Sequence, residues 1–215
     1  MPALPLPAPP AEAAFTVLPV TRQEVPLWYH VYSTQRFSQT HARSFAQGWG
    51  DTRFAPIEHA PGEPVHTYYA ASDRQACYME SVLHDVVLQP PGMFEVDTLR
   101  HLHLVTLRLP PSVACVQFHT PFLPALGLSR AQLVDSLPAQ YPETRAWAQA
   151  AYAQCPQAQA IAYGSRRHDA GRCLMLFKQR LPDPPFEMLA EEPLAVGPRR
   201  AELLALVRAL KLHEV

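Results

Sequence analysis

Short apolar blocks rich in aromatic and β-branched residues recur along the chain and have the length and composition of β-strands. They cover residues 27–33, 65–71, 101–109, 113–118, 160–163 and 173–178. Four other segments place apolar residues at helical spacing: residues 73–87, 130–137, 142–154 and 198–212. Because strands and helices do not alternate strictly, we predict a single α+β domain with a central mixed or antiparallel sheet flanked by helices.

The predicted helix over residues 73–87 carries a carboxylate among its apolar positions. Ser72 and Gln75 have the capping-box spacing that starts a helix. The apolar stripe consists of Ala76, Met79, Leu83, Val86 and Val87. Glu80 falls within this stripe, and since burial of an unpaired carboxylate is unfavourable, it needs a partner, a cavity or a chemical role. Pairing with His84 one turn on, or with an arginine, is the structural alternative and stays open at this point.

Residues 1–24 form a segment rich in proline and alanine ahead of the predicted domain. Proline removes backbone donors and disfavours helix in its neighbours, so residues 1 to about 14 are predicted to be an extended, poorly ordered arm. The folded domain is expected to span residues 25–215, because a chain of 215 residues that is 48% hydrophobic supplies one good core. The arm and the terminal helix from residue 198 could mediate contacts, but covering the core is the favoured interpretation.

Charge and composition exclude several classes of protein. The net charge is -1 and no block of Lys or Arg occurs, so we expect no nucleic-acid partner. The start of the chain lacks the pattern of a signal peptide, and no run reaches the ~18 apolar residues of a membrane span. We therefore expect a soluble, cytoplasmic protein. The four cysteines, widely spaced and without a C-x-x-C pair, are interpreted as reduced thiols.

Common nucleotide-binding motifs are missing from the sequence. It contains neither G-x-G-x-x-G nor G-x-x-x-x-G-K-[ST], which argues against Rossmann and P-loop folds. Ser165 follows Tyr163 and Gly164 without the G-x-S-x-G spacing of a hydrolase nucleophile. A hydroxyl in a tight turn beside Arg166 and Arg167 suits a phosphate better than an acyl group.

The histidines give a weak metal-binding signal. His101 and His103 have the spacing of two ligands on one strand face, but no third ligand follows at a diagnostic distance along the sequence. We therefore expect no metal site. Cys77 is interpreted as a small core residue, because nothing in the sequence points to a reactive thiolate.

Five segments follow one another in an order shared with a known family. They are Trp28-Tyr29-His30-Val31-Tyr32, Gly50-Asp51-Thr52-Arg53-Phe54, Tyr69-Ala70-Ala71-Ser72 followed by Glu80 and His84-Asp85, the stretch from Tyr141 to Ala148, and Tyr163-Gly164-Ser165-Arg166. Together they resemble the RES-domain family, named for an Arg, a Glu and a Ser, whose members include toxins of bacterial toxin-antitoxin pairs. The resemblance implies a fold similar to the ADP-ribosyltransferase enzymes, with a split sheet and NAD clamped in a cleft. It also implies an enzyme that degrades NAD by phosphorolysis or hydrolysis.

The resemblance assigns roles to the candidate site residues. Glu80 is the implied catalytic carboxylate, which would stabilise positive charge on the ribose as nicotinamide leaves. Tyr69 would border the nicotinamide. Arg53 and Ser165 would grip the pyrophosphate or an incoming inorganic phosphate, and Arg166 would join them in binding NAD.

His30 departs from the family pattern. Many relatives carry Arg at this strand position, whereas one branch of the wider superfamily has a His that bonds a ribose hydroxyl. His30 is therefore a candidate NAD-binding residue, but its presence leaves open a non-catalytic NAD-binding module. A third possibility is an ADP-ribosyltransferase that uses a protein as acceptor.

Partners are implied by family analogy alone. NAD is the expected substrate, inorganic phosphate is a candidate co-substrate, and no further cofactor is expected. A cognate antitoxin protein is the expected partner, while self-association stays open.

Overall fold

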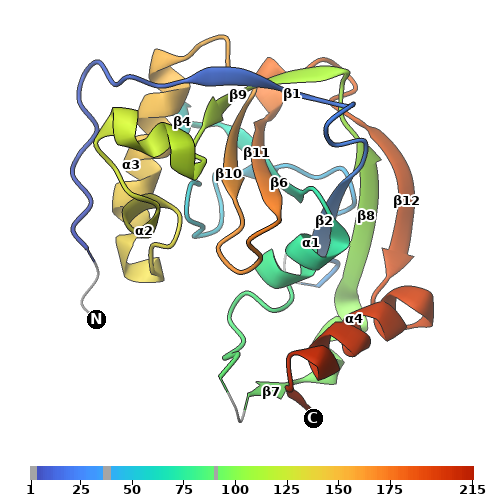
Figure 1. Cartoon of the computed structure of the whole chain (residues 1–215). Helices are drawn as coiled ribbons and strands as arrows, with labels where there is room; N and C mark the ends of the chain where they lie inside the picture. The colour runs from blue at the N-terminus through green and yellow to red at the C-terminus, as the bar shows by residue number, and fades with distance from the viewer. Residues whose placement is uncertain (1–3, 36–39, 90–91) are drawn as a thin grey trace.

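A curled nine-stranded sheet forms the centre of the described chain, which comprises residues 4–35, 40–89 and 92–215 of a computed structural model (Figure 1). Its strands, in spatial order, are β1 (Val17–Thr21), β9 (Ser112–Gln117), β10 (Ala160–Gly164), β11 (Arg172–Phe177), β6 (His66–Ala71), β2 (Trp28–Ser33), β8 (Leu102–Arg108) and β12 (Glu187–Pro193), and β3 (Ala46–Gln47) also pairs with β6. Neighbouring strands are antiparallel except β9 and β10, which are parallel. The sheet is therefore mixed, as the sequence pattern predicts.

The sheet divides between β6 and β2. These strands meet at one register pair, Tyr29 with Ala71, whereas β2 and β8 pair along their whole length. The first residues of β6 pair instead with β3, through Thr67 and His66. Two halves of one sheet thus diverge beside the strand that carries Tyr69.

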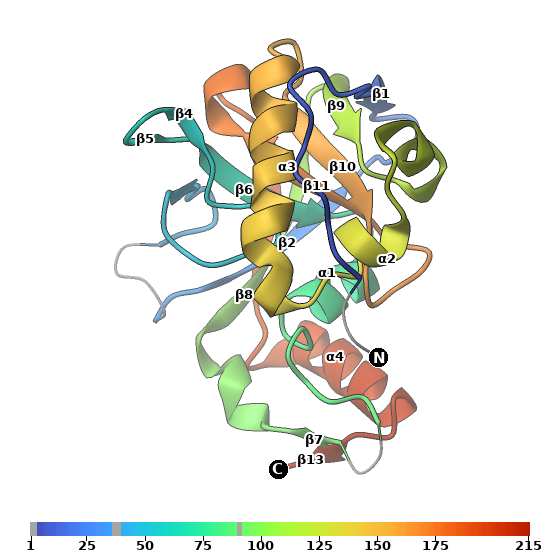
Figure 2. The same ribbon diagram turned by 90° about the vertical axis from the view of Figure 1, so that its left-hand side faces the viewer.

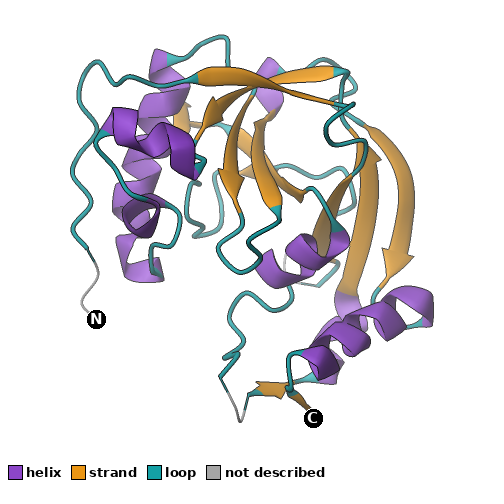
Figure 3. Cartoon of the chain, viewed as in Figure 1, coloured by secondary structure: helices purple, strands orange, loops and turns teal. Residues whose placement is uncertain are grey.

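The four α-helices pack against one face of the sheet (Figure 3). They are α1 (Arg74–Glu80), α2 (Arg130–Leu133), α3 (Tyr141–Gln154) and α4 (Gly197–Ala209). The core between these helices and the sheet includes Leu83, Trp147, Met175 and Leu203. A second core on the opposite face is built by Trp28, Tyr68, Phe186 and Phe45, without any residue from an α-helix. Both faces of the central strands are buried, which explains their continuous apolar runs.

Shorter elements connect these layers. Two small strand pairs are β4 (Glu58–Ala60) with β5 (Glu63–Pro64), and β7 (Met93–Phe94) with β13 (His213–Glu214). The 3₁₀ turns are η1 (Val96–His101), η2 (Thr120–Leu126), η3 (Pro138–Gln140) and η4 (Lys178–Arg180). No helix in the described part of the chain is long and apolar enough to cross a membrane.

The helix predicted over residues 73–87 is wrong beyond Glu80, where α1 ends. The carbonyls of Leu83, His84 and Val86 accept hydrogen bonds from the Arg167 guanidinium instead of from a continuing helix. The start also differs, because the side chain that accepts from Ala76 N is that of Asp73, at 2.7 Å. Glu80 therefore lies at a helix end and not in its middle.

The other predicted elements were confirmed with different bounds. Two longer strands of the sheet, β1 and β12, were missed, as were the strands of two or three residues, β3, β4, β5, β7 and β13. The helix predicted over residues 130–137 ends at Leu133, and the one predicted over 198–212 ends at Ala209. β12 was missed because it is a polar edge strand with three glutamates, and β1 because it contains Pro19. Edge strands accept proline and charge because one side of the strand needs no partner.

The predicted domain start at residue 25 is too late. β1 begins at Val17 and pairs with β9 from Val17–Val116 to Thr21–Ser112. Residues 4–14 are extended, as proline dictates, but the chain lies against α3 rather than free in solvent (Figure 2). The sequence analysis predicted a poorly ordered arm because it could not detect the α3 side chains, Trp147 and Gln154, that bind the arm.

Candidate active site

Glu80 is held by a cluster of donors at the end of α1. Its Oε1 accepts a hydrogen bond from Ser165 Oγ at 2.6 Å. It also accepts from the backbone N–H of Arg166 at 2.6 Å and of Arg167 at 3.2 Å. The side chain is 13% exposed. Three donors on one oxygen fix the orientation of the carboxylate. The sequence left open which partner a glutamate on an apolar stripe would have, and these three donors are that partner.

The Ser165 turn is shaped to hold that carboxylate. Ser165 is fully buried, its N–H donates to the Gly171 carbonyl at 2.8 Å, and its carbonyl accepts from Arg130 at 2.6 Å. Its Oγ accepts from the backbone N–H of Arg167 at 3.1 Å and of His168 at 3.0 Å while donating to Glu80. The hydroxyl has thus used its donor and both acceptor positions. The sequence analysis predicted that Ser165 binds a phosphate, whereas in the structure its hydroxyl bonds Glu80 and two backbone N–H groups.

Arg53 faces the other oxygen of the carboxylate. Its NH1 lies 3.9 Å from Glu80 Oε2, and the side chain is 5% exposed. Within the described residues, Nε and NH2 of Arg53 have no hydrogen-bond partner although both are buried. An unpartnered buried donor on a charged group costs free energy comparable to a lost charged hydrogen bond. Such a group is therefore a candidate ligand-binding residue.

α3 supports Arg53 from behind. The Thr144 hydroxyl donates to the Arg53 carbonyl, and the Tyr141 ring lies 5.9 Å from the Arg53 guanidinium carbon. Arg145 pairs with Asp51 in the same segment. Tyr141, Thr144 and Arg145 were not singled out on the sequence beyond their place in one family-like stretch, because their role depends on tertiary contact.

Tyr69 completes this side of the site. Its hydroxyl lies 2.9 Å from Thr52 Oγ1, next to Arg53 in the chain. Burial raises the pKa of Tyr69 to about 12, against the lowering effect of the bond to Thr52. The phenol therefore remains uncharged at neutral pH and offers an aromatic ring and a hydroxyl. Thr52 was missed as a site residue, and no sequence signal beyond its proximity to Arg53 pointed to it.

Arg166 has a free side chain beside the carboxylate. Its backbone N–H bonds Glu80, whereas its guanidinium makes no hydrogen bond or ion pair with any described residue. Arg167, in contrast, uses its guanidinium to hold the chain after α1. Arg166 is thus the neighbour of Glu80 that is available to a ligand.

His30 lies on the other side of the sheet from Glu80. Its neighbours Tyr29 and Val31 pack into the core covered by the helices, while Trp28 and Tyr32 join the opposite core, and alternation places His30 with the latter. Its ring is 4.1 Å from that of Tyr68, centroid to centroid. His30 Nδ1 bonds the Tyr69 carbonyl at 2.8 Å where β2 and β6 diverge.

The imidazole of His30 is uncharged. Burial lowers its pKa to about 4, against the raising effect of the bond to the Tyr69 carbonyl. A carbonyl accepts hydrogen bonds, so Nδ1 carries the proton and Nε2 keeps its lone pair. The structure therefore links His30 to the backbone of Tyr69 and not to the Glu80 carboxylate.

The two histidines with metal-like spacing do not share a strand face. His101 ends η1, while His103 lies on β8 with its Nδ1 3.6 Å from Glu191. No group of three or more His, Cys, Asp or Glu residues among those described could hold a metal ion.

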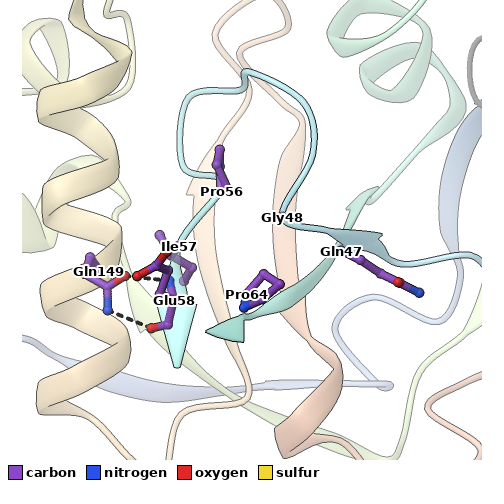
Figure 4. A pocket seen from close by; sticks show the side chains of 7 residues that line it. All are labelled: Gln47, Gly48, Pro56, Ile57, Glu58, Pro64 and Gln149. Carbon is purple, nitrogen blue, oxygen red and sulfur yellow. Dashed lines mark hydrogen bonds between the residues drawn. The ribbon is translucent and has the colours of Figure 1, made fainter. Parts of the chain in front are cut away.

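An open cavity of about 420 Å3 is lined by none of the site residues described above (Figure 4). Its lining residues are Gln47, Gly48, Pro56, Ile57, Glu58, Pro64 and Gln149. The Gln149 side-chain amide already bonds the Glu58 backbone twice: its Oε1 accepts from the Glu58 N–H at 2.7 Å, and its Nε2 donates to the Glu58 carbonyl at 2.9 Å. Gly48 and Pro56 mark the two ends of the loop that carries Arg53, so the cavity lies at the base of that loop. We assign no reaction to it.

Fold and site together define a class of protein: an α+β domain in which an anchored carboxylate faces a buried arginine, two of whose nitrogens lack partners among the described residues, beside a split sheet. Residues 18–195 match the family model described as the RES domain. The chain therefore belongs to the RES-domain family, which confirms the resemblance seen in the sequence.

Comparison with solved structures finds a similar fold. A chain in the crystal structure of the M. tuberculosis MbcT-MbcA toxin-antitoxin complex has a similar fold, with a TM-score of 0.53 and 18% sequence identity. The alignment covers 86% of this chain and 88% of that one. No curated protein gives a significant match.

Proposed function

We propose that the protein degrades NAD by cleaving the bond between nicotinamide and ribose, with inorganic phosphate or water as the acceptor. One observation carries the proposal: Glu80 Oε1 is held by three donors, while Oε2 is left open toward Arg53 at 3.9 Å. This arrangement offers a fixed anion for a sugar that becomes positive and a buried cation for a phosphate. Membership of the RES-domain family supports the same substrate.

The reaction requires charge stabilisation at the ribose. The bond from ribose C1′ to the pyridinium nitrogen breaks, and its electron pair leaves with nicotinamide, which departs uncharged. The ribose acquires oxocarbenium character, which Glu80 Oε2 would stabilise because the carboxylate is already oriented and needs no reorganisation. An oxygen of water or phosphate then bonds to C1′. Water releases a proton to the solvent as this bond forms, whereas phosphate attacks through an oxygen that is already deprotonated.

The remaining residues would position the substrate. The free guanidinium of Arg166 and the unpartnered Nε and NH2 of Arg53 would bind the pyrophosphate or the incoming phosphate. Tyr69, an uncharged phenol, would border the nicotinamide ring. Ser165 would act through Glu80, since its own hydrogen bonds are used. His30 would act through the Tyr69 backbone.

A toxin of a toxin-antitoxin pair is the biological role that we propose with this activity. The family and the toxin-antitoxin complex in which the similar fold occurs both support it. A cognate antitoxin would then bind the protein and suppress NAD loss. Co-expression with the neighbouring gene product should give a complex on size-exclusion chromatography. It should also restore the growth of cells in which the protein alone depletes NAD.

The test follows nicotinamide release from NAD by the purified protein, with and without inorganic phosphate. Wild type should release nicotinamide, and Glu80→Gln should reduce the rate by about three orders of magnitude, the loss typical of one preorganised charge. Glu143→Gln makes the same chemical change on the exposed surface of α3 and should leave the rate unchanged. Absence of release by wild type, or equal rates for the two variants, would contradict the proposal.

The acceptor is identified in the same experiment. A rate that depends on phosphate, with ADP-ribose 1″-phosphate as product, indicates phosphorolysis, whereas free ADP-ribose in both conditions indicates hydrolysis. Transfer of label from radioactive NAD to a protein would indicate ADP-ribosyltransfer instead of phosphorolysis or hydrolysis. NAD binding without cleavage would reduce the protein to a binding module.

A further inference from the structure

The proline-rich arm binds α3 in a repeating pattern. Side chains of two residues on one face of the helix, and of its N-cap residue Gln140, donate hydrogen bonds to carbonyls of the arm. The three pairs are Gln140 to Leu4, Trp147 to Pro7 and Gln154 to Pro10, at 2.8, 2.7 and 3.1 Å. The donors are seven residues apart and the acceptors three apart, so one repeat of the helix matches one repeat of the arm.

The lengths of these repeats agree. Seven residues of α-helix rise by about 10.5 Å, and three residues of polyproline II helix by about 9.3 Å. A polyproline II segment therefore stays in register with this face of α3 over three successive contacts. Figure 2 shows the arm running beside α3 in the same direction.

Additional contacts fix the arm at both ends. Gln132 of α2 donates to the Pro5 carbonyl at 2.8 Å, and Ala13 N donates to Gln154 Oε1 at 2.8 Å. Leu6 packs against the main core, as does Phe15, whose ring lies edge-on to Trp147 with centroids 6.2 Å apart. Both termini of the segment are thus bound.

This surface has the chemistry of a polyproline-binding groove. It supplies indole and amide N–H donors, and the arm contributes mainly carbonyls, which suits prolines because they have no N–H to satisfy. Proline-rich segments also lose little conformational entropy on binding, since they already populate the polyproline II form. Gln140, Trp147 and Gln154 form this groove, and we use the term for these three residues.

We propose that residues 4–13 are a built-in ligand of the polyproline groove on α3, and that occupancy of the groove holds Arg53 in position. The coupling runs through α3, where Thr144, which binds the Arg53 carbonyl, lies one helical turn from both Gln140 and Trp147 on the same side of the helix. The Tyr141 ring of the same helix faces the Arg53 guanidinium. The arm lies outside residues 18–195 matched by the RES domain, so it adds a support to the family's core. The effect on substrate rests on the proposed function, but the binding of the arm does not.

The groove is tested first without substrate. A chain lacking residues 1–13 is titrated with a fluorescein-labelled synthetic peptide of residues 1–15, and we expect saturable binding by anisotropy. A peptide with Pro7→Ala and Pro10→Ala keeps the carbonyls but loses polyproline II preference, and should bind several-fold more weakly. No binding of either peptide to a folded truncated chain, or equal binding of both, overturns the groove.

Full-length variants cover the case in which the truncated chain does not fold. Gln140→Leu combined with Gln154→Leu removes two donors at similar volume, while Gln157→Leu changes an exposed glutamine just beyond the helix and is the control. Limited proteolysis should cut the arm of the double variant at least ten-fold faster than that of wild type or the control. Equal cleavage rates overturn the proposal.

Coupling to Arg53 is measured by amide hydrogen exchange over residues 50–56, which needs no substrate. Exchange there should accelerate in the truncated chain and slow again when the peptide is added. In NAD cleavage, truncation should raise KM about ten-fold with a smaller change in kcat, and the peptide should reverse it. Unchanged exchange overturns the coupling, whereas faster exchange without any NAD cleavage by wild type would reject the proposed function alone.

Discussion

The two sides of the Arg53–Glu80 pair are built differently. On one side, Glu80 Oε1 accepts three hydrogen bonds, and the Ser165 hydroxyl that supplies one of them is itself fully bonded. On the other, the guanidinium of Arg53 is as buried as a core residue but leaves Nε and NH2 without a partner among the described residues. The protein thus supplies hydrogen-bond donors to the Glu80 carboxylate but leaves two nitrogens of the Arg53 guanidinium without acceptors among the described residues.

The two residues differ in this way because the proposed reaction makes different demands on a carboxylate and on an arginine. A carboxylate that must act on a developing charge gains from fixed orientation, because reorganisation during the reaction is then avoided. An arginine that must bind phosphate needs donors that no protein group occupies. The cost of those free donors falls on the stability of the unliganded protein. Replacing each residue in turn should therefore change activity in the same direction and stability in opposite directions.

Glu80→Gln should give the largest loss of activity, about three orders of magnitude in kcat for nicotinamide release. It should also lower the free energy of unfolding by about 1 kcal/mol, because charge-assisted hydrogen bonds become neutral ones. Urea titration measures the second effect and steady-state kinetics the first. An increase in stability would show that the three donors do not favour the anion.

Arg53→Met should have the opposite effect on stability. Removing a buried guanidinium whose Nε and NH2 lack partners among the described residues, at similar volume, should raise the free energy of unfolding by about 1 to 2 kcal/mol, because the ion pair with Glu80 that is also lost is long, at 3.9 Å. The KM for NAD should rise by about ten- to a hundred-fold, the equivalent of one or two lost charged hydrogen bonds. Arg100→Met, at a site 65% exposed, is the control and should change neither quantity. A destabilised Arg53→Met protein would contradict the comparison.

The anion side of the site was easier to predict from sequence than the cation side. Glu80 was detected because a carboxylate on an apolar stripe has few structural explanations, and its partner turn was visible as Tyr163-Gly164-Ser165-Arg166. The direction of the Ser165 hydroxyl could not be predicted, since it depends on where α1 ends. That end is set by Arg167, which binds carbonyls about 80 residues earlier in the chain.

The fold shows the same limit. Strands buried on both faces have continuous apolar runs, and those were predicted close to their true bounds. β1 and β12 lie at the sheet edges and carry proline or glutamate, so their pairing depends on β9 and β8 rather than on local pattern. The arm was predicted to be extended, but the groove that binds it is spread over about four helical turns more than 130 residues away.

Ser165→Ala sharpens the comparison further, with a smaller effect on activity than either change above. Glu80 keeps its two backbone donors, but the N–H groups of Arg167 and His168 lose the oxygen that they share. The expected results are a roughly ten-fold lower kcat and a loss of about 1 to 3 kcal/mol in unfolding free energy. Ser112→Ala, at an exposed position on β9, is the control. A complete loss of activity with unchanged stability would instead indicate direct contact between Ser165 and substrate.

The effect expected at His30, which joins the two halves of the sheet, is on the pH dependence of stability. Its pKa in the folded protein is about 4, below the ordinary 6.5, because of burial. The unfolded chain therefore takes up a proton first as pH falls, and the free energy of unfolding should decline from about pH 6.5 to about pH 4. His119, also at about 4 through burial and the nearby arginines Arg172 and Arg130, should add to this decline. Urea titrations across this range should give a shallower slope for His30→Asn, whereas exposed His213→Asn should match wild type. An unchanged slope for His30→Asn would mean that the imidazole at the split is open to solvent and that the Tyr69 carbonyl is held by other groups.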